Sequence, residues 1–397
     1  MKYGYSQRMA NLNGTATREI FKLLSRPEII SFAGGLPASE CLPEREIAQI
    51  ASELLSGKDA MRILQYGTSE GFDDFRDALV KYVEKVGIVG QERENSLVIS
   101  GGQNGIDLVL KTLIDKGDTV LVEDPTYLAF LQILNSYEGR AVGVRANADG
   151  LDIDDLTRKI EKHKPKLLYV VPTFSNPTGK TYTAENRKAI ADLTAKYGVT
   201  VLEDDPYGKL RFSGSPVPSL KSFDQCGNIV YITSFSKLIS PGLRTGVAVG
   251  DKEIIRKMTI CKQGTDLHTS NLSQLIVKEY MTKYLEGHIE QSLPLYKKRK
   301  QAMIKAIDAY MPFLEHTDPD GGLFVFGKLP CGLDAAKLLP QAVERNVAYI
   351  QGSVFYADGG HEDTIRLNYS NASEEQIERG IKSLAQLIKE KIGGIRQ

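Results

Sequence analysis

The sequence lacks the features that mark membrane, secreted and nucleic-acid-binding proteins. It has no run of about 18 apolar residues, the length that a membrane-spanning helix needs, and residues 1–8 lack the apolar core of a signal peptide. Its 397 residues include 50 lysines and arginines and 50 aspartates and glutamates, so the formal net charge is zero. Such a chain has no general attraction to nucleic acid or to an anionic membrane. We therefore expect a cytoplasmic protein that binds neither.

Cysteine and histidine are also scarce. The four cysteines show no Cys-x-x-Cys spacing, which argues against a zinc site and against a disulfide framework. The five histidines are dispersed, and no two of them have the spacing of metal ligands on a helix. We expect no metal, and free thiols that are mostly packed.

Short apolar runs alternate with helical patterns from about residue 96 onwards. The runs are 96–100, 119–122, 167–171, 199–202 and 229–233. Strands that are apolar throughout and alternate with helices are typical of a mostly parallel sheet covered on both faces. The sequence therefore predicts an α/β fold, with a large domain built around this sheet.

The pattern changes after about residue 285. A charged helix around 296–310 precedes a predicted strand at 321–326, a further helix and strand follow, and another strand is predicted at 365–369. Ser373-Glu-Glu-Gln376 has the spacing of a capping box and predicts the start of a last helix. Since chain ends often lie close together, we expect residues 50–285 to form the large domain, and residues 1–49 and 286–397 to form a smaller α+β domain.

Two glycine-containing segments that follow predicted strands are compatible with phosphate binding. Residues 100–105, Ser-Gly-Gly-Gln-Asn-Gly, lead into a helix whose first amides would suit a phosphate, although the pattern is not Gly-x-Gly-x-x-Gly. Residues 173–181 end in Gly-Lys-Thr, as a nucleotide P-loop does, but Phe174 stands where the first glycine of that motif is required. Neither segment therefore predicts a nucleotide site.

Polar residues also follow the other predicted strands. They lie in Glu-Asp-Pro-Thr-Tyr at 123–127, Glu-Asp-Asp-Pro-Tyr at 203–207, and the loop at 234–246 with its lysine and arginine. Each alone has an ordinary structural explanation: Tyr127 as a packed ring, Asp204 as a helix cap, or Lys237 as a surface charge. Open α/β sheets bind ligands at the carboxyl ends of their strands, so their shared position predicts one common site.

The ordered set of these motifs resembles the fold-type I pyridoxal-phosphate aminotransferases of class I/II. The set is Gly102-Gln103, Tyr127, Asn176-Pro-x-Gly, Asp204-x-x-Tyr207, Ser234-x-x-Lys237, Arg244 and a late Arg366. Residues 31–37 and 204–207 are most similar to the branch that contains 2-aminoadipate and kynurenine aminotransferases. The resemblance covers essentially the whole chain and implies a large domain of three layers.

The resemblance implies pyridoxal 5'-phosphate as the cofactor and assigns the residues that hold it. Lys237 would form the Schiff base with the cofactor aldehyde. Arg244 and Ser234 would bind the phosphate, together with Gly102 and Gln103 at a helix N-terminus.

Further residues would surround the cofactor ring. Tyr127 would stack on it, and Asp204 would keep its nitrogen protonated, which the chemistry requires. Asn176 and Tyr207 would hydrogen-bond the phenolic oxygen. Lys237, once released, would move a proton during catalysis.

Substrate recognition follows from the same resemblance. Arg366 would bind the α-carboxylate bidentately, with Asn176 and Gly35 beside it. The implied reaction moves an amino group from an L-amino acid to a 2-oxo acid such as 2-oxoglutarate by a ping-pong mechanism. Arg18 is a candidate for the distal carboxylate of 2-aminoadipate or glutamate, although an exposed helix arginine explains it equally well. Aromatic and aliphatic substrates are also compatible.

The family works as a dimer with active sites at the interface. Tyr66 matches the tyrosine that reaches the neighbouring subunit's phosphate, so the resemblance implies a homodimer, and residues 269–271 are placed near the same interface. Two other functions keep the same residues. A pyridoxal-phosphate β-lyase or decarboxylase would use Lys237 and Asp204, and a non-catalytic regulator would keep the fold without turnover.

Overall fold

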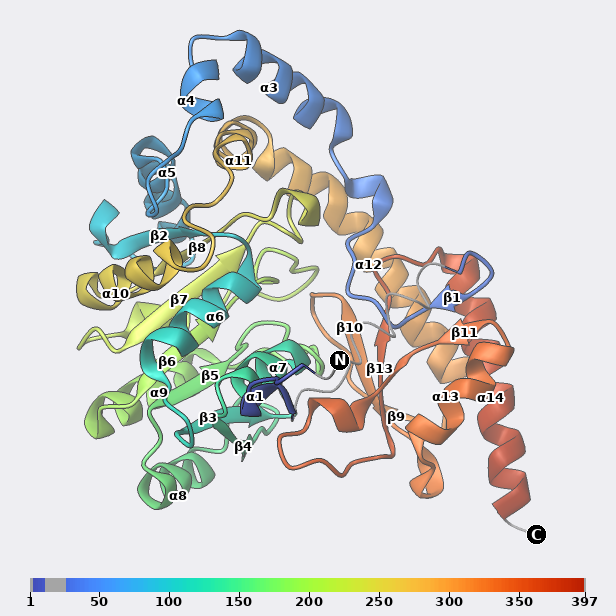
Figure 1. The fold of residues 1–397 in the computed structure, drawn as a ribbon. Helices are drawn as coiled ribbons and strands as arrows, with labels where there is room; N and C mark the ends of the chain where they lie inside the picture. Colours follow the sequence, from blue (N-terminus) through green and yellow to red (C-terminus); the bar gives the residue numbers. More distant parts are fainter. Residues whose placement is uncertain (1–2, 11–25, 396–397) are drawn as a thin grey trace.

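A seven-stranded sheet forms the centre of the computed structural model, which describes residues 3–10 and 26–395 (Figure 1). Its strand order is β2-β8-β7-β6-β5-β3-β4. The strands are β2 (Ser96–Ile99), β3 (Thr119–Asp124), β4 (Arg140–Arg145), β5 (Leu167–Val170), β6 (Thr200–Asp204), β7 (Ile229–Ser234) and β8 (Gly246–Val249). Only β8 runs against its neighbours in this sheet. The predicted α/β fold with a mostly parallel sheet is confirmed.

Helices cover both faces of this sheet, as the apolar strand sequences predict. Along β5, Leu167 and Tyr169 belong to one apolar cluster with α6 (Gly102–Leu113). Leu168 and Val170 point to the other face and belong to a second cluster, with α8 (Ile153–His163) and α9 (Ala184–Tyr197). Since successive side chains alternate between faces, a strand that is apolar throughout has to be covered on both sides.

Two strands of the central sheet were not predicted, and one helix is longer than predicted. β4 is an edge strand with an exposed arginine at each end. It was not predicted, because its apolar centre is too short to indicate a buried strand. β8 begins at Gly246, where the polar loop at 234–246 ends, and no strand was predicted there. The helix predicted around 296–310 is the second half of α12 (Leu285–Tyr310), which continues through Pro294.

The remaining helices surround these strands and the C-terminal part of the chain. They are α1 (Gln7–Ala10), α3 (Glu44–Ser56), α4 (Ala60–Leu64), α5 (Asp73–Glu84), α7 (Leu128–Ser136), α10 (Lys252–Gln263), α11 (Asn271–Lys283), α13 (Ala335–Glu344) and α14 (Glu374–Ile395). The predicted capping box of α14 is confirmed, since Gln376 N donates to Ser373 Oγ and Ser373 N donates to Gln376 Oε1, at 3.2 and 2.9 Å. Among the described helices, none is long and apolar enough to cross a bilayer.

A second, antiparallel sheet lies in the C-terminal part of the chain, in the order β12-β13-β10-β9. Its strands are β9 (Glu315–His316), β10 (Phe324–Lys328), β12 (Ile350–Gln351) and β13 (Thr364–Asn368). Nearby, β1 (Ile30–Ser31) pairs in parallel with β11 (Val347–Ala348). This pairing brings residues near the start of the chain against its C-terminal part. The domain boundaries at residues 50 and 285 stay a prediction.

All four cysteines are free. The expectation that they are mostly packed is wrong for two of them, because Cys226 and Cys331 are exposed. Cys226 follows the short helix at Leu220–Phe223, and Cys331 lies within Pro330–Gly332. Both positions are surface connections, where a small side chain can remain in contact with water.

Candidate active site

A cavity of about 310 Å³ lies where the carboxyl ends of the parallel strands meet residues of the C-terminal sheet. Most of the predicted site residues line it: Gly35, Gly102, Gln103, Tyr127, Asn176, Asp204, Tyr207, Ser234, Lys237, Arg244 and Arg366. Of the other two, Tyr66 does not line it, and Arg18 lies outside the described residues. Side chains from five strand ends and from the C-terminal sheet are thus brought into one space.

Lys237 follows β7 and extends into the cavity. Its Nζ donates a hydrogen bond to the carbonyl oxygen of Gly35 at 2.7 Å. Burial, together with the charges of Arg244 and Arg366, lowers the pKa of the Lys237 amine to about 8. A lysine with a lowered pKa has a larger neutral fraction at physiological pH, which is the form that attacks a carbonyl group.

Arg244 and the start of α6 form a concave, positively charged cradle. Arg244 has a left-handed φ of +48°, and its Nη2 donates to Ser100 O at 3.2 Å. Its guanidinium lies so close to Gly101 that a Cβ atom there would be 2.5 Å from Nη2. The first turn of α6 adds the amides of Gly102 and Gln103, since such N–H groups have no partner within a helix.

Two serines complete this cradle. Ser234 Oγ and Ser236 Oγ are 2.7 Å apart, and Arg244 Nη1 lies 3.4 Å from Ser236 Oγ. A guanidinium, hydroxyls and free amides are the groups that bind phosphate oxygens. The cradle therefore fits the phosphate of the expected cofactor. Ser236 and Gly101 were not predicted as site residues, although both adjoin residues that were.

Asp204 ends β6 and places a buried carboxylate in the cavity. Burial raises the pKa of Asp204 to about 7, while a hydrogen bond from the Tyr169 hydroxyl to Oδ2, at 2.9 Å, opposes this rise. A buried carboxylate in such a position favours a cation beside it. A protonated ring nitrogen would fit that requirement. Tyr169 was missed because it lies within the apolar run that predicts β5.

Asn176, Tyr127 and Tyr207 lie beside Asp204 in the same cavity. Burial raises the pKa of Tyr127 to about 12 and also raises the pKa of Tyr207. Both phenols therefore stay protonated at neutral pH and can donate a hydrogen bond. The ring of Tyr207 meets Phe324 edge to face, at 5.8 Å between centroids.

Arg366 projects from β13 into the opposite side of the cavity. Its Nη1 donates to Asn176 Oδ1 at 2.7 Å and its Nη2 donates to Ala33 O at 2.5 Å. The guanidinium carbon lies 4.3 Å from the ring centroid of Phe324 and 5.1 Å from that of Phe355.

Burial lowers the pKa of Arg366 to about 10, so the group remains charged. Its Nε is buried without a hydrogen-bond partner in the part of the chain that the structure describes. Since an unpaired buried donor is costly, this atom marks a place for an acceptor such as a carboxylate. Phe324 and Phe355 lie in apolar stretches of the sequence, where nothing distinguishes them from core residues, so they were not predicted as site residues.

Tyr66 lies on the outside of its own chain. It is 79% exposed and follows α4, on which Met61 and Leu64 are 78% and 75% exposed. Its ring meets that of His268 edge to face, with 6.0 Å between centroids. No described residues bring three histidine, cysteine, aspartate or glutamate side chains together as a metal site.

Comparison with known proteins identifies the family. The model of aminotransferase class I and II matches residues 35–384. The chain is an aminotransferase of this family. The predicted resemblance is thereby confirmed, and with it the transfer of an amino group between an amino acid and a 2-oxo acid.

Relatives of this aminotransferase are similar over nearly their whole length. The aromatic-amino-acid aminotransferase 1 of Thermococcus litoralis is 38% identical over 395 residues, which cover 98% of this chain and 94% of that protein. A crystal structure of the Pyrococcus horikoshii kynurenine aminotransferase in complex with PMP superposes with a TM-score of 0.93 at 39% identity, covering 98% and 97% of the two chains. The Thermus thermophilus alpha-aminoadipate aminotransferase, complexed with N-(5'-phosphopyridoxyl)-L-leucine, gives 0.91 at 34% identity and covers 98% of both chains.

Proposed function

We propose that this aminotransferase binds pyridoxal 5'-phosphate in the cavity and acts as a homodimer with two shared active sites. The observation that carries the proposal is the convergence of Lys237, Asp204, Arg244 and Arg366 on one cavity. Lys237 supplies a nucleophile, Asp204 a negative charge for a ring cation, and the two arginines positive charges for a phosphate and for a carboxylate. When bound, the cofactor supplies an aldehyde that takes up the amino group and a ring that accepts electrons from the substrate α-carbon.

The cradle around Arg244 would hold the phosphate, and Asp204 would hold the protonated ring nitrogen at the other end. Ser234, Gly102 and Gln103 are the further phosphate ligands in this proposal. Asp204 is well suited because its carboxylate is buried and accepts a side-chain hydrogen bond from the Tyr169 hydroxyl. A neighbouring cation would lower the pKa of Asp204 and keep the carboxylate ionised.

Lys237 would hold the cofactor aldehyde between turnovers and would move the proton of the substrate α-carbon once its amine is free. Its pKa of about 8 suits both tasks, because the amine can change its charge near neutral pH. Tyr207 and Asn176 would bind the phenolic oxygen, and Tyr127 would lie against the ring. All three line the cavity together with Lys237.

The substrate α-carboxylate would bind Arg366, next to Asn176 and Gly35. The unpartnered Nε of Arg366 and the planar guanidinium support this role. Leu36, Leu128, Ile350 and Phe355 give the cavity an apolar wall, which favours aromatic and aliphatic donors. Acceptance of 2-aminoadipate or glutamate through Arg18 remains a prediction, tested by comparing turnover of 2-aminoadipate and leucine in Arg18→Ala. Equal losses for both substrates would argue against that role.

The homodimer rests on the exposed apolar group formed by Met61, Leu64 and Tyr66. Adjacent exposed apolar side chains of this kind mark an interaction surface. In the dimer, Tyr66 would reach the phosphate in the partner's cradle.

The decisive experiment is a visible absorption spectrum of the purified protein with pyridoxal phosphate, before and after amino acids are added without an oxo acid. We expect the cofactor band to be replaced by that of the aminated cofactor in the wild type and not in Lys237→Ala. Stoichiometric consumption of 2-oxoglutarate then separates amino transfer from a β-lyase or decarboxylase, which would release ammonia or carbon dioxide. A protein that binds no cofactor under these conditions would contradict the proposal.

A further inference from the structure

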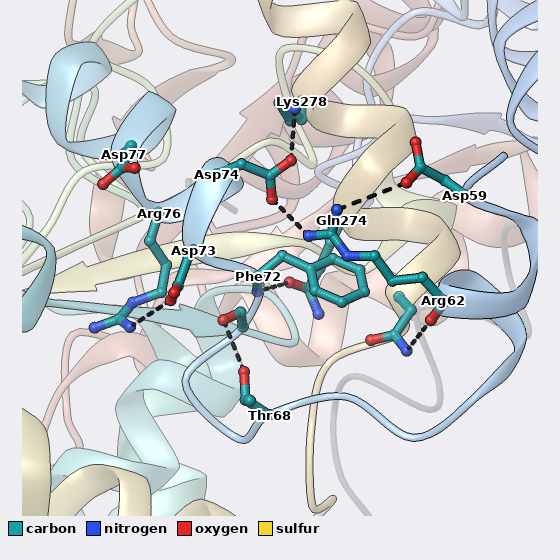
Figure 2. A network of polar contacts seen from close by, with 12 residues as sticks. Asp59, Arg62, Thr68, Phe72, Asp73, Asp74, Arg76, Asp77, Gln274 and Lys278 are labelled. Atoms are coloured by element: carbon teal, nitrogen blue, oxygen red, sulfur yellow. Dashed lines mark hydrogen bonds and ion pairs between the residues drawn. The ribbon is translucent and has the colours of Figure 1, made fainter.

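The loop that carries Tyr66, residues 65–71, is shaped by side chains from α11. The side chain of Tyr66 is 79% exposed. The backbone on both sides of it is held by hydrogen bonds with side chains of α11. Figure 2 shows the polar contacts around this loop, with Thr68 and Phe72 on the loop side and Gln274 and Lys278 on α11.

Asn271 holds the first half of the loop. This residue opens α11 and is buried, with 4% exposure. Its Nδ2 donates to Gln65 O at 2.7 Å and lies 3.4 Å from Arg62 O. A Cβ on Gly67 would be 2.4 Å from Asn271 Oδ1, although Gly67 does not have the left-handed φ that would itself exclude a side chain. Asn271 and Gly67 thus fix how closely the turn at Tyr66 lies against α11.

Gln274 holds the second half of the loop. It is fully buried, accepts a hydrogen bond from Phe72 N at 2.9 Å and donates one to Thr269 O at 2.8 Å. The turn is closed by Thr68 Oγ1, which donates to Gly71 O at 2.9 Å. The amide of Gln274 therefore ties the end of the loop to the segment just before α11.

Asp74 connects α4, α5 and α11 beside this loop (Figure 2). Its two carboxylate oxygens accept from Arg62 Nη2 and Lys278 Nζ, each at 2.7 Å. The guanidinium of Arg62 also lies 3.9 Å from the ring centroid of Phe72. These contacts fix the positions of α4 and α5 relative to α11. The distance that the loop spans between α4 and α5 is therefore fixed as well.

We propose that Asn271 and Gln274 are positioning residues for the cofactor site of the partner subunit. They shape the 65–71 loop so that Tyr66 projects from its own chain toward the neighbouring cradle. This inference rests on the proposed function, in which Tyr66 completes the phosphate site across the dimer. Asn271 and Gln274 touch no cofactor themselves, so their effect passes through the backbone of the loop and appears in the other subunit.

Heterodimers with one working site test this inference. In the first arrangement, a Lys237→Ala/Asn271→Ala chain is paired with a wild-type chain, so the working site receives Tyr66 from the altered loop. In the second, a Lys237→Ala chain is paired with an Asn271→Ala chain, so the working site receives Tyr66 from an unaltered loop. We expect the Kd of pyridoxal phosphate at the working site to rise about 3- to 10-fold in the first arrangement and to stay unchanged in the second.

Homodimers test the contact between Gly67 and Asn271. Gly67→Ala should weaken cofactor binding about tenfold or more, because the methyl group displaces the turn. In the Asn271→Ala background the same substitution should have almost no further effect, since the clashing oxygen is gone. Gly287→Ala on α12 is the matched control, because the added methyl group would have no neighbour within 4 Å beyond the adjacent residues and backbone of its own helix. The Kd of this variant should equal that of the wild type.

The outcomes separate this inference from the proposed function. The reference variant carries Tyr66→Phe on the Lys237→Ala chain and is paired with a wild-type chain. It removes the proposed contact of the Tyr66 hydroxyl with the phosphate at the working site. If Tyr66→Phe weakens binding in this arrangement and Asn271→Ala does not, the positioning role is wrong while the shared site stands. If Tyr66→Phe has no effect, or the protein does not form a dimer, both are wrong. A larger loss in the second arrangement than in the first would likewise overturn the positioning role.

Discussion

Tyr169→Phe should raise the pKa of Asp204 and weaken cofactor binding at neutral pH. The Tyr169 hydroxyl donates to Asp204 Oδ2 at 2.9 Å, and it opposes the effect of burial on that carboxylate. Phenylalanine keeps the ring, which stacks on Phe130 with 3.8 Å between centroids. The substitution therefore removes one hydrogen bond to the ionised form of Asp204 and changes little of the packing.

The magnitude follows from this one bond. A hydrogen bond to a charged group contributes about 1.5 to 3 kcal/mol, and a pKa change of one unit corresponds to about 1.4 kcal/mol. Losing it should raise the pKa of Asp204 by about one to two units above its value of about 7 in the cofactor-free protein. Because a protonated Asp204 cannot pair with a ring cation, and the ionised fraction of Asp204 at pH 7 would fall from about one half to between about one tenth and one hundredth, cofactor binding at neutral pH should weaken about 5- to 50-fold.

The assay is a titration with pyridoxal phosphate at several pH values from acid to alkaline. Affinity of the wild type should fall as the pH drops below about 7, and in Tyr169→Phe this fall should begin about one to two units higher. Tyr197→Phe is the control, since its hydroxyl also donates to a carboxylate, that of Glu161, but lies outside the cavity. If both variants give the wild-type profile, Tyr169 does not set the charge of Asp204 and the reasoning fails.

Three further predictions concern Gly101 and Arg366 in the site and the buried carboxyl group of Glu123. Gly101→Ala should weaken cofactor binding about tenfold or more in equilibrium dialysis, because its Cβ would lie 2.5 Å from Arg244 Nη2; Gly117→Ala, at a similar φ of +87° but in open space, should not, and equal losses in the two would assign the effect to backbone strain. Arg366→Lys should raise KM for the amino donor about tenfold or more while cofactor affinity is unchanged, and an unchanged KM would remove Arg366 from the carboxylate site. Burial raises the pKa of Glu123 to about 8. The protonated carboxyl group therefore stabilises the fold fully below the ordinary pKa of 4.5, and this stabilisation is lost as the pH rises to about 8. Glu123→Gln should make the Tm of the cofactor-free protein fall less over this range than the Tm of the wild type, and an equal fall in both proteins would contradict this.

The position of the site could be predicted from sequence because parallel strands end at the same edge of the sheet. Runs of Val, Ile and Leu mark the buried strands, and the polar residues directly after them have to gather at one edge of a parallel sheet. Lys237, Asp204 and Asn176 each follow such a run and line one cavity. Arg366 could not be placed in this way, since it belongs to an antiparallel strand of the other sheet. It was found through the family resemblance instead.

The supporting residues could not be predicted because their partners are distant in the chain. Tyr169 belongs to an apolar strand, and its hydroxyl is relevant to the site only because it donates to Asp204, 35 positions away. Asn271 and Gln65 are 206 positions apart, yet the amide of one donates to the carbonyl of the other. A period of two or of 3.6 residues shows which face is buried, but it does not show which buried polar atoms meet.

The charges of the cavity explain why a cofactor with an anion at one end and a cation at the other suits it. Without such a ligand, the charges of Arg244 and Arg366 act with burial to lower the pKa of Lys237, and Asp204 is half protonated near pH 7. A phosphate on Arg244 would offset one of the two positive charges that disfavour charged Lys237. A ring cation beside Asp204 would favour its ionised form in the same way. Each end of the proposed cofactor would thus remove an unfavourable charge arrangement that the folded chain imposes, so the two ends would favour binding together although different strands would hold them.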